Sequence, residues 1–499
     1  MPMRNRKQEY RPVTALTWLK IAGVALSYFL VECYAYVLLQ PGDWMGLAFG
    51  GAWALLLSAD SNTLLLCHLT DELPILFSLD GMGRVFAGLV SVLWPLASLY
   101  GFEYMKHEER ENSFFSWYTM SYAATLAIAF AGNLFTLYVF YESLTLITLP
   151  LVIHKKDAQS IRAGRKYLNF SITGAAMAFI AMVCLIYIGG TTEFRLGGVL
   201  DAAKIAGNED LLLVVFVLAF VGFGTKAAVF PMHAWLPAAS VAPTPVTALL
   251  HAVAVVNAGA FAVLRLIYHS FGTEMLYGSW AQTAVLALAC VTFLFGSAMA
   301  VREQHFKRRL AWSTISNLSY MLMGAALMTE GGMVGSLSHL VIHGVIKITL
   351  FYCAGAILVR TGKEQVQDLR GFGRLMPMTC AMFTLGSAAL MGIPPLCGFV
   401  SKWNLLTAAA DTGLPMGVVA IGTLIVSAVL TAVYLFTVVI PMYNRPLNAD
   451  MQHLSGFNRD PGWMMIVPML IHCAAMIALG LGSQPLIAFL RQTAAGPVM

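Results

Sequence analysis

The sequence has little charge and no long polar stretch. Charged side chains make up 11% of its 499 residues, whereas a soluble domain carries about 25%. The longest polar stretch lies near 190–210 and is too short to fold into a separate nucleotide-, flavin- or iron–sulfur-binding domain. These absences exclude a soluble enzyme and a redox domain carried within this chain.

The sequence also lacks motifs for cofactors and catalysis. Its eight cysteines stand singly in apolar runs without a C-x-x-C pair, so we interpret them as small core side chains. It contains no Walker loop, haem motif or nucleophile elbow in a supporting context. We therefore expect no catalytic site, cofactor or metal in this chain. The net charge of +5 does not indicate nucleic-acid binding, because its distribution follows the apolar segments.

Apolar residues are what the sequence has in abundance. Hydrophobic residues make up 59% of the chain, and the mean hydropathy is +0.74. A membrane-spanning helix needs roughly 20 consecutive apolar residues. The sequence therefore predicts an all-α polytopic protein of about 14 transmembrane helices in the lipid bilayer of the cell inner (plasma) membrane. The candidate spans lie near 16–38, 44–66, 83–103, 114–131, 133–153, 168–189, 211–230, 246–267, 279–301, 310–328, 334–358, 376–410, 415–440 and 463–490.

The basic residues predict an orientation. The loops after spans 3, 5, 9, 11 and 13 hold 17 of the 30 Lys and Arg residues. Cytoplasmic loops carry an excess of these residues, so we expect the odd-numbered loops to face the cytoplasm. The basic segment 4–11 conflicts with this orientation, so either the first hairpin is miscounted or the later loops overrule the first span, and we favour the second. It precedes no small-residue cleavage site, so we interpret the first span as uncleaved.

Two spans contain prolines close to a lysine. In span 7 Lys226 precedes Pro231, and in span 12 Pro394 and Pro395 precede Lys402. Proline removes a backbone donor and breaks a helix. Freed backbone groups persist in a membrane only where protein or water satisfies them. The two spans run in opposite directions because they lie five spans apart, which favours inverted-topology repeats.

Ionisable residues inside these apolar helices are the candidate functional residues. A charge at bilayer depth is costly and is retained for a use, typically in an ion or proton route. The strongest candidates for proton translocation are Glu142, Lys226, His251, His339, His343, Lys347 and Lys402. A buried lysine can gain and release a proton, whereas arginine stays charged.

Each candidate also has a structural interpretation. Glu142 could form a static salt bridge with a buried lysine, and the lysines could extend to the membrane interface. His339, His343 and Lys347 share one helix face at i, i+4 and i+8, which suits a proton relay, structural hydrogen bonds or, less well, a metal site.

Other residues have weaker claims. Arg84 and Arg265 lie near span ends and are expected to reach the interface. Glu32, Asp60 and His233 are expected to be structural.

The chain resembles the antiporter-like transport proteins of respiratory complex I, of Mrp-type sodium/proton antiporters (their D and A components) and of membrane-bound hydrogenases. The resemblance covers roughly 75–440. It rests on four segments, which are T-K-A-A-V-F-P-M-H-A-W-L-P (225–237), A-P-T-P-V-T-A-L-L-H-A (242–252), L-A-W-S-T-I-S (310–316) and the run 339–355.

The resemblance implies 14 helices with two inverted five-helix repeats and broken helices 7 and 12. The implied regions are N-terminal helices 1–3 (1–110), a first repeat (111–270), a second repeat (271–445) and helix 14 (446–499). It implies that the seven candidate residues match the family's proton-translocating positions. Two departures are Asn257, where many relatives have lysine, and the end at residue 499, without the long lateral helix of the largest complex I relative.

The implied function is proton translocation within a multisubunit complex I-like or hydrogenase-like complex, with other membrane subunits and peripheral redox subunits as partners. The chain would be the ion-pumping subunit of a translocating oxidoreductase. Alternatives are a component of a Mrp-type Na⁺/H⁺ antiporter similar to its D component, a proton-coupled bicarbonate-uptake subunit with a zinc-bearing partner, and a scaffold that moves no ions.

Overall fold

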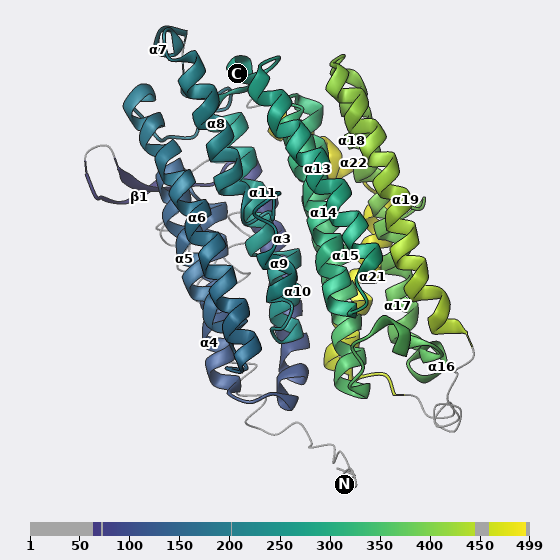
Figure 1. Ribbon diagram of the computed structural model, residues 1–499. Helices are drawn as coiled ribbons and strands as arrows, with labels where there is room; N and C mark the ends of the chain where they lie inside the picture. Colours follow the sequence, from purple (N-terminus) through teal and green to yellow (C-terminus); the bar gives the residue numbers. More distant parts are fainter. Residues whose placement is uncertain (1–62, 71–72, 201, 445–458, 496–499) are drawn as a thin grey trace.

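The computed structural model describes residues 63–70, 73–200, 202–444 and 459–495. Figure 1 shows two groups of long helices side by side. The first group comprises α3 (Gly81–Tyr104), α4 (Glu111–Ala129), α5 (Leu134–Val152), α6 (Ala158–Gly189), α8 (Glu209–Gly224), α9 (Trp235–Ala239), α10 (Thr244–Ala252) and α11 (Val255–Arg265). The second comprises α13 (Trp280–Arg302), α14 (Phe306–Ala326), α15 (Glu330–Thr361), α17 (Pro377–Met391), α18 (Cys397–Asp411) and α19 (Pro415–Tyr443).

Shorter elements and the C-terminal helices complete the described fold. α21 packs against α3 and α15, so it bridges the two groups. The remaining elements are the strands β1 (Thr63–His68) and β2 (Pro74–Ser78), the short helices η2 (Met105–His107), α7 (Ala202–Ile205), η3 (Leu266–Phe271), α12 (Thr273–Leu276), η4 (Val366–Leu369) and α16 (Phe372–Leu375), and then α21 (Trp463–Leu481) and α22 (Gln484–Ala495). The predicted span 16–38 and the residues Glu32 and Asp60 lie outside the described residues.

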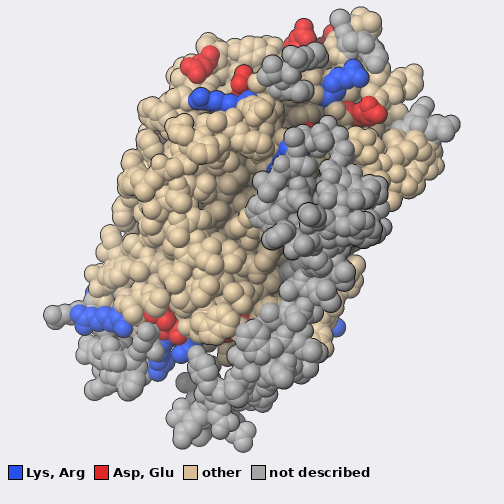
Figure 2. All heavy atoms as spheres, turned by 180° about the vertical axis from the view of Figure 1, so that it is seen from behind, with Lys and Arg blue, Asp and Glu red and all other residues tan. Residues whose placement is uncertain are grey.

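Charged residues gather at the two ends of the molecule, with a broad uncharged belt between them (Figure 2). Within the described residues, eight helices are long and apolar enough to cross a membrane. The count of 14 spans therefore stays a prediction. Helix breaks and interior polar residues lower the length and hydropathy of several described helices, which is why fewer helices meet that criterion.

The basic loops lie together at one end, the lower end in Figure 1. Lys155 is 3.6 Å from Glu108, and the amide of Phe306 donates to the carbonyl of Glu364 at 2.7 Å. The first contact joins the loops after spans 3 and 5, and the second joins the loops after spans 9 and 11, as expected if the members of each pair share one side of the membrane. Which side is cytoplasmic stays a prediction.

Several helices begin at a polar residue that the sequence places before an apolar run. The side chain of the preceding residue accepts a hydrogen bond from the first helical turn, which satisfies an amide that has no partner within the helix. These N-cap residues are Asp80, Asn133, Asp157, Ser279 and Thr329.

A β-hairpin corrects the prediction that residues 44–66 form one helical span. β1 pairs antiparallel with β2, so residues 63–66 are strand and not helix. The amide of Gly132 donates to Leu76 at 2.9 Å and the amide of Ser78 donates to Phe130 at 2.7 Å, which anchors the hairpin to the turn between α4 and α5. Hydropathy failed here because a short apolar run fits a strand and a helix equally well.

Both lysine-bearing spans are interrupted in the structure. α8 ends at Gly224, and a turn segment precedes α9. In the second group, α17 ends at Met391 and α18 begins at Cys397. A third interruption separates α10 from α11 at residues 253–254, where the sequence has no proline to indicate it.

One long helix of the second group runs without a break and packs against helices of both groups. α15 spans 32 residues and is largely buried, and it packs against α3, α10, α14, α17, α18 and α21. The helix carries His339, His343 and Lys347 near its middle.

Candidate functional site

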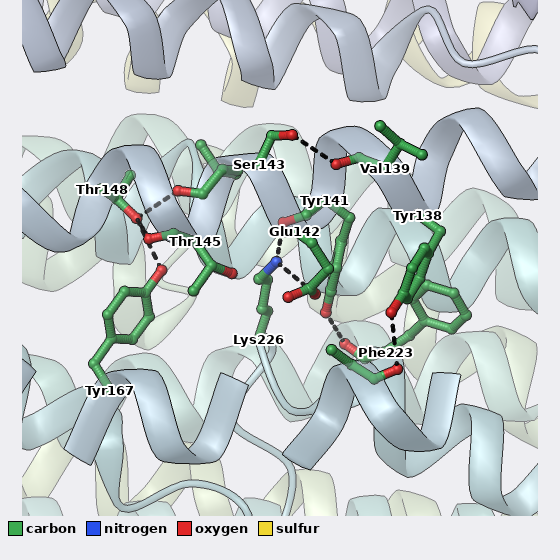
Figure 3. A network of polar contacts seen from close by, with 12 residues as sticks. Tyr138, Val139, Tyr141, Glu142, Ser143, Thr145, Thr148, Tyr167, Phe223 and Lys226 are labelled. Atoms are coloured by element: carbon green, nitrogen blue, oxygen red, sulfur yellow. Dashed lines mark hydrogen bonds and ion pairs between the residues drawn. The ribbon is translucent and has the colours of Figure 1, made fainter. Parts of the chain in front are cut away.

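Glu142 and Lys226 form an ion pair between α5 and the interruption after α8. The Lys226 ammonium lies 3.4 Å from the Glu142 carboxylate and also donates to the backbone carbonyl of Tyr141. Figure 3 shows the ammonium pointing between these two groups. The Lys226 side chain is 1% exposed and that of Glu142 is 23% exposed. The pair is therefore shielded on the lysine side and more open on the carboxylate side.

Tyr141 holds the pair in place. Its ring lies under the Lys226 ammonium, 3.3 Å from the ring centroid, a cation–π contact. Its hydroxyl donates to the carbonyl of Phe223 at 2.6 Å, near the end of α8 (Figure 3). This bond satisfies a carbonyl that the helix end leaves without a partner. The interruption and the ion pair are thus connected through one residue.

Other side chains satisfy the backbone of this interruption. The Trp235 indole donates to the carbonyl of Thr225 at 2.9 Å, and the Thr292 hydroxyl of α13 accepts from the amide of Phe230 at 3.0 Å. Irregular backbone at membrane depth requires such partners. The bond to Thr292 joins the interruption of the first group to the second group.

The face of α15 that carries His339, His343 and Lys347 is buried. The rings of His339 and His343 have centroids 6.0 Å apart. The Lys347 ammonium donates to the hydroxyl of Ser313 and to the carbonyl of Leu310, the latter at 3.1 Å. Within the described chain, neither ring nitrogen of His343 has a hydrogen-bond partner. A buried polar group without a partner is costly, so a hydrogen-bonded water would stabilise this ring.

Lys402 is held by the end of a helix. Its ammonium donates to the carbonyls of Leu390 and Met391, at 2.7 and 3.1 Å. These carbonyls close α17, where the helix dipole is negative and favours a cation. The hydroxyl of the neighbouring residue Ser401 lies 2.9 Å from Nδ1 of His339, so the residue next to Lys402 contacts the histidine face of α15.

His251 lies between the two groups. Its ring is 4.9 Å from that of Phe351 on α15, and neither of its nitrogens has a hydrogen-bond partner in the described part of the chain. The Lys347 ammonium is near enough to interact electrostatically with it. Asn257 donates to the carbonyl of Ala252 at 2.8 Å, and this bond satisfies a group freed by the interruption between α10 and α11.

The structure thus brings the seven predicted residues into two neighbouring sets. Glu142 and Lys226 form one set, and the other five lie along α15 and its neighbours. α11 packs against both α8 and α15, between the two sets.

The prediction that Arg265 extends to the membrane interface is wrong. It is 1% exposed and pairs with Asp80, which it contacts through both terminal nitrogens, one of them at 2.6 Å from Oδ1. His269 lies beside the pair, with Nε2 3.7 Å from Oδ2 of Asp80. Asp80 and His269 were not among the predicted residues. The sequence signal that could have indicated these two residues was the i, i+4 spacing of Arg265 and His269 together with an aspartate directly before a span.

Arg84 lies in the first turn of α3 and is half-buried.

Among the described residues, no group of three or more His, Cys, Asp and Glu side chains is placed to hold a metal ion. His233 lies in the first interruption among aromatic rings, 5.0 Å from the ring of Phe295.

The fold and the buried ionisable side chains define a polytopic helical membrane protein with charged groups in its interior. A family model described as NADH:quinone oxidoreductase/Mrp antiporter, transmembrane, matches residues 131–431. The chain belongs to this family. It is accordingly an antiporter-like subunit of the kind found in complex I, Mrp and hydrogenase complexes, and it resides in the cell membrane.

Two curated relatives and one solved structure illustrate the similarity. NADH-quinone oxidoreductase subunit N of Desulforudis audaxviator is 31% identical over 412 residues, 81% of this chain and 80% of the relative. Hydrogenase-4 component B of Escherichia coli is 31% identical over 339 residues, 65% of this chain and 49% of the relative. The chain thus spans about half the length of the second relative. A chain of the Mrp complex from Dietzia sp. matches 96% of this chain and 95% of its own length, with a TM-score of 0.78 and 22% identity, which shows the shared fold.

Proposed function

We propose that this subunit translocates protons along the buried residues Glu142, Lys226, His251, His339, His343, Lys347 and Lys402. The observation that supports the proposal most is the Glu142–Lys226 ion pair, whose lysine lies in a helix interruption while its carboxylate lies on the continuous helix α5. A lysine on irregular backbone can leave its partner when that backbone moves. Opening would leave a buried ammonium without its counter-charge and favour release of a proton.

Protons would then move through the middle of the molecule. The released proton would reach His251 and the face of α15, where ring nitrogens without hydrogen-bond partners can accept it. It would continue by His339 and Ser401 to Lys402. Each protonation changes the charge next to the following group, so the sites titrate together. This coupling would let a distant driving reaction act on the route.

We also propose the arrangement that this route requires. The paired interruptions in α8–α9 and α17–α18 support two inverted five-helix repeats, at residues 111–270 and 271–445, within a bundle of about 14 helices. The relatives are named as subunits of larger complexes, and we infer that this chain assembles with other membrane subunits and with peripheral redox subunits. A Mrp-type exchanger without a redox partner is the alternative.

The test uses the intact complex in sealed membrane vesicles. Replacing Lys226 or Lys402 with alanine should abolish proton movement in a complex that still assembles. Wild-type proton movement in both variants would show that the chain is a scaffold. Sodium-dependent proton movement without any electron donor would instead favour the exchanger.

A further inference from the structure

α6 runs along the outer side of the first helix group (Figure 1) and is longer than the hydrocarbon core of a membrane is thick. Its 32 residues extend for roughly 48 Å at 1.5 Å per residue, whereas the core is roughly 30 Å thick. The apolar part of the helix, near 168–189, is long enough to cross that core. The first turns of α6, residues 158–167, therefore lie at the level of the lipid headgroups on the side of the basic loops.

One side of α6 packs against the protein and the other is left open. Within the described residues, α6 packs against α5, α7, α8 and α9. The contact with α8 is close, since a side chain added at Gly174 would meet the carbonyl of Gly222. On the opposite side the exposed residues recur every three or four positions, which is the spacing of one helix face. We call the exposed residues from Arg162 to Val183 the outer face of α6.

The first turns of the outer face carry three cations. Arg162, Arg165 and Lys166 are exposed, whereas the intervening residues 163 and 164 are buried. At i, i+3 and i+4, the three side chains leave the helix on the same side. Within the described residues, none of the three forms an ion pair with an acidic side chain. Their positive charges therefore have no counter-charge from the described chain.

A polar turn follows the cations on the same face. Asn169 and Thr173 are exposed, and the Thr173 hydroxyl donates to the backbone carbonyl of Asn169 at 2.9 Å. The side-chain amide of Asn169 has no hydrogen-bond partner in the described part of the chain. Hydrocarbon offers no partner either, so an amide at this depth is costly unless a lipid or a protein satisfies it. Asn169 lies three residues after Lys166, roughly 4.5 Å further into the membrane along the helix axis.

Apolar side chains complete the outer face. Ile172, Phe179, Ile180 and Val183 are between 45% and 56% exposed. They extend for roughly 16 Å along the part of α6 that crosses the hydrocarbon core. The face thus presents cations, then an amide, then apolar surface. A phospholipid presents a phosphate, then ester carbonyls, then acyl chains, in the same order from the headgroup layer inward.

We propose that the outer face of α6 binds an anionic phospholipid. The phosphate lies between Arg162, Arg165 and Lys166, and arginine suits it because a planar guanidinium donates two parallel hydrogen bonds to a phosphate. An ester carbonyl accepts from the Asn169 amide, and an acyl chain lies along the apolar residues beyond it. The three unpaired cations select a headgroup with a net negative charge. This inference is independent of the proposed function, since lipid binding requires no ion movement.

The same basic residues have two other interpretations. In the first, they only orient the chain during membrane insertion. Orientation depends on the charge near the end of the span and not on which lipid contacts the helix, so it predicts no preference between lipids at α6. In the second, another subunit of the complex covers this face, which would keep all lipids away from it.

The experiment uses the intact complex in vesicles of phosphatidylcholine that contain a photoreactive lipid with a diazirine in an acyl chain. Two probes are compared, phosphatidylglycerol and phosphatidylcholine. Peptide mass spectrometry measures the labelling of residues 172–183 after illumination. We expect phosphatidylglycerol to label wild type about fivefold more than phosphatidylcholine, or better, which is the ratio that a single basic residue contributes near an anionic lipid surface.

The variants remove the cations of the outer face. The triple variant (Arg162→Gln, Arg165→Gln and Lys166→Gln) should lower labelling by phosphatidylglycerol to the level of phosphatidylcholine. Arg165→Gln alone covers the case in which the triple variant fails to assemble. It keeps two of the three cations and should reduce the preference for phosphatidylglycerol without abolishing it.

The control removes the same amount of charge elsewhere at the same end of the molecule. It replaces the exposed residues Arg302, Lys363 and Arg374, which lie in the loops after α13 and α15, with glutamine. The labelling of α6 by both probes should be the same in this variant as in wild type.

Three results would overturn the inference. Equal labelling of wild type by the two probes would leave only the orienting role. An unchanged preference in the triple variant, or in Arg165→Gln where the triple variant does not assemble, would show that these cations do not hold the lipid. Absence of labelling of α6 by either probe would show that another subunit covers the face.

Discussion

The sharpest prediction concerns the single charge of Glu142. Replacing it with glutamine keeps the size of the side chain and removes the counter-charge 3.4 Å from Lys226. Breaking a buried ion pair by removing one partner costs about 3–5 kcal/mol. The Glu142 side chain is 23% exposed, so we take the lower end of that range. A cost of about 3 kcal/mol lowers the ratio of protonated to neutral Lys226 by about a hundredfold, at about 1.4 kcal/mol per factor of ten.

The lysine keeps other partners, which limits the structural damage. The carbonyl and ring of Tyr141 remain in contact with the ammonium, so Glu142→Gln should assemble normally. We expect proton movement to fall by one to two orders of magnitude, roughly in line with the lost protonation. The assay follows acidification of sealed vesicles and the rate of the driving reaction in the same sample.

Two further variants complete this test. Glu209→Gln makes the same chemical change at an exposed position in the first turn of α8 and should leave transport unchanged. Glu142→Asp keeps the charge on a shorter side chain and should retain part of the rate. Transport within about twofold of wild type in assembled Glu142→Gln, less than a kcal/mol of barrier, would refute the reasoning.

Two more predictions follow from the second set of residues. Lys347→Arg keeps the charge beside Ser313 but should stop proton movement in vesicles, because arginine does not release its proton; wild-type transport would show that Lys347 acts only as a fixed charge. Asn257→Ala should lower stability by about 1–3 kcal/mol, because it leaves the carbonyl of Ala252 without its partner. A thermal unfolding midpoint of the purified complex equal to wild type would contradict this account, and Asn112→Ala, in the first turn of α4, is the control.

The helix interruptions show where sequence reasoning succeeds in this chain. Pro231 and Pro394 act locally on their own backbone, so their effect can be read without knowing the neighbours. The interruption at 253–254 has no proline, and its freed carbonyl depends on Asn257 of the next helix. The hairpin likewise depends on the turn at Gly132, which is distant in the sequence.

In the candidate site, too, the sequence shows some features and only the packing of distant helices shows the others. An ionisable residue in an apolar helix is visible in the sequence because it is out of place, and all seven candidates were found by that signal. For Glu142 the sequence predicted a buried lysine as the partner without saying which lysine, and the partners of the other six were not visible. That Lys402 is held by the end of α17, and that Arg265 is neutralised by Asp80 rather than by the interface, follow from how distant helices pack.

The unbroken course of α15 has a consequence for how this chain tolerates insertions. Each residue in a helix turns the next by about 100°, so one residue added between His343 and Lys347 would rotate the lysine away from the histidine face and from Ser313. The same addition in the segment between α8 and α9 would be absorbed by a turn. The length of α15 is therefore fixed, whereas the interrupted segments on either side can change in length. Insertions and deletions among relatives should accumulate in the interrupted segments and be absent from α15.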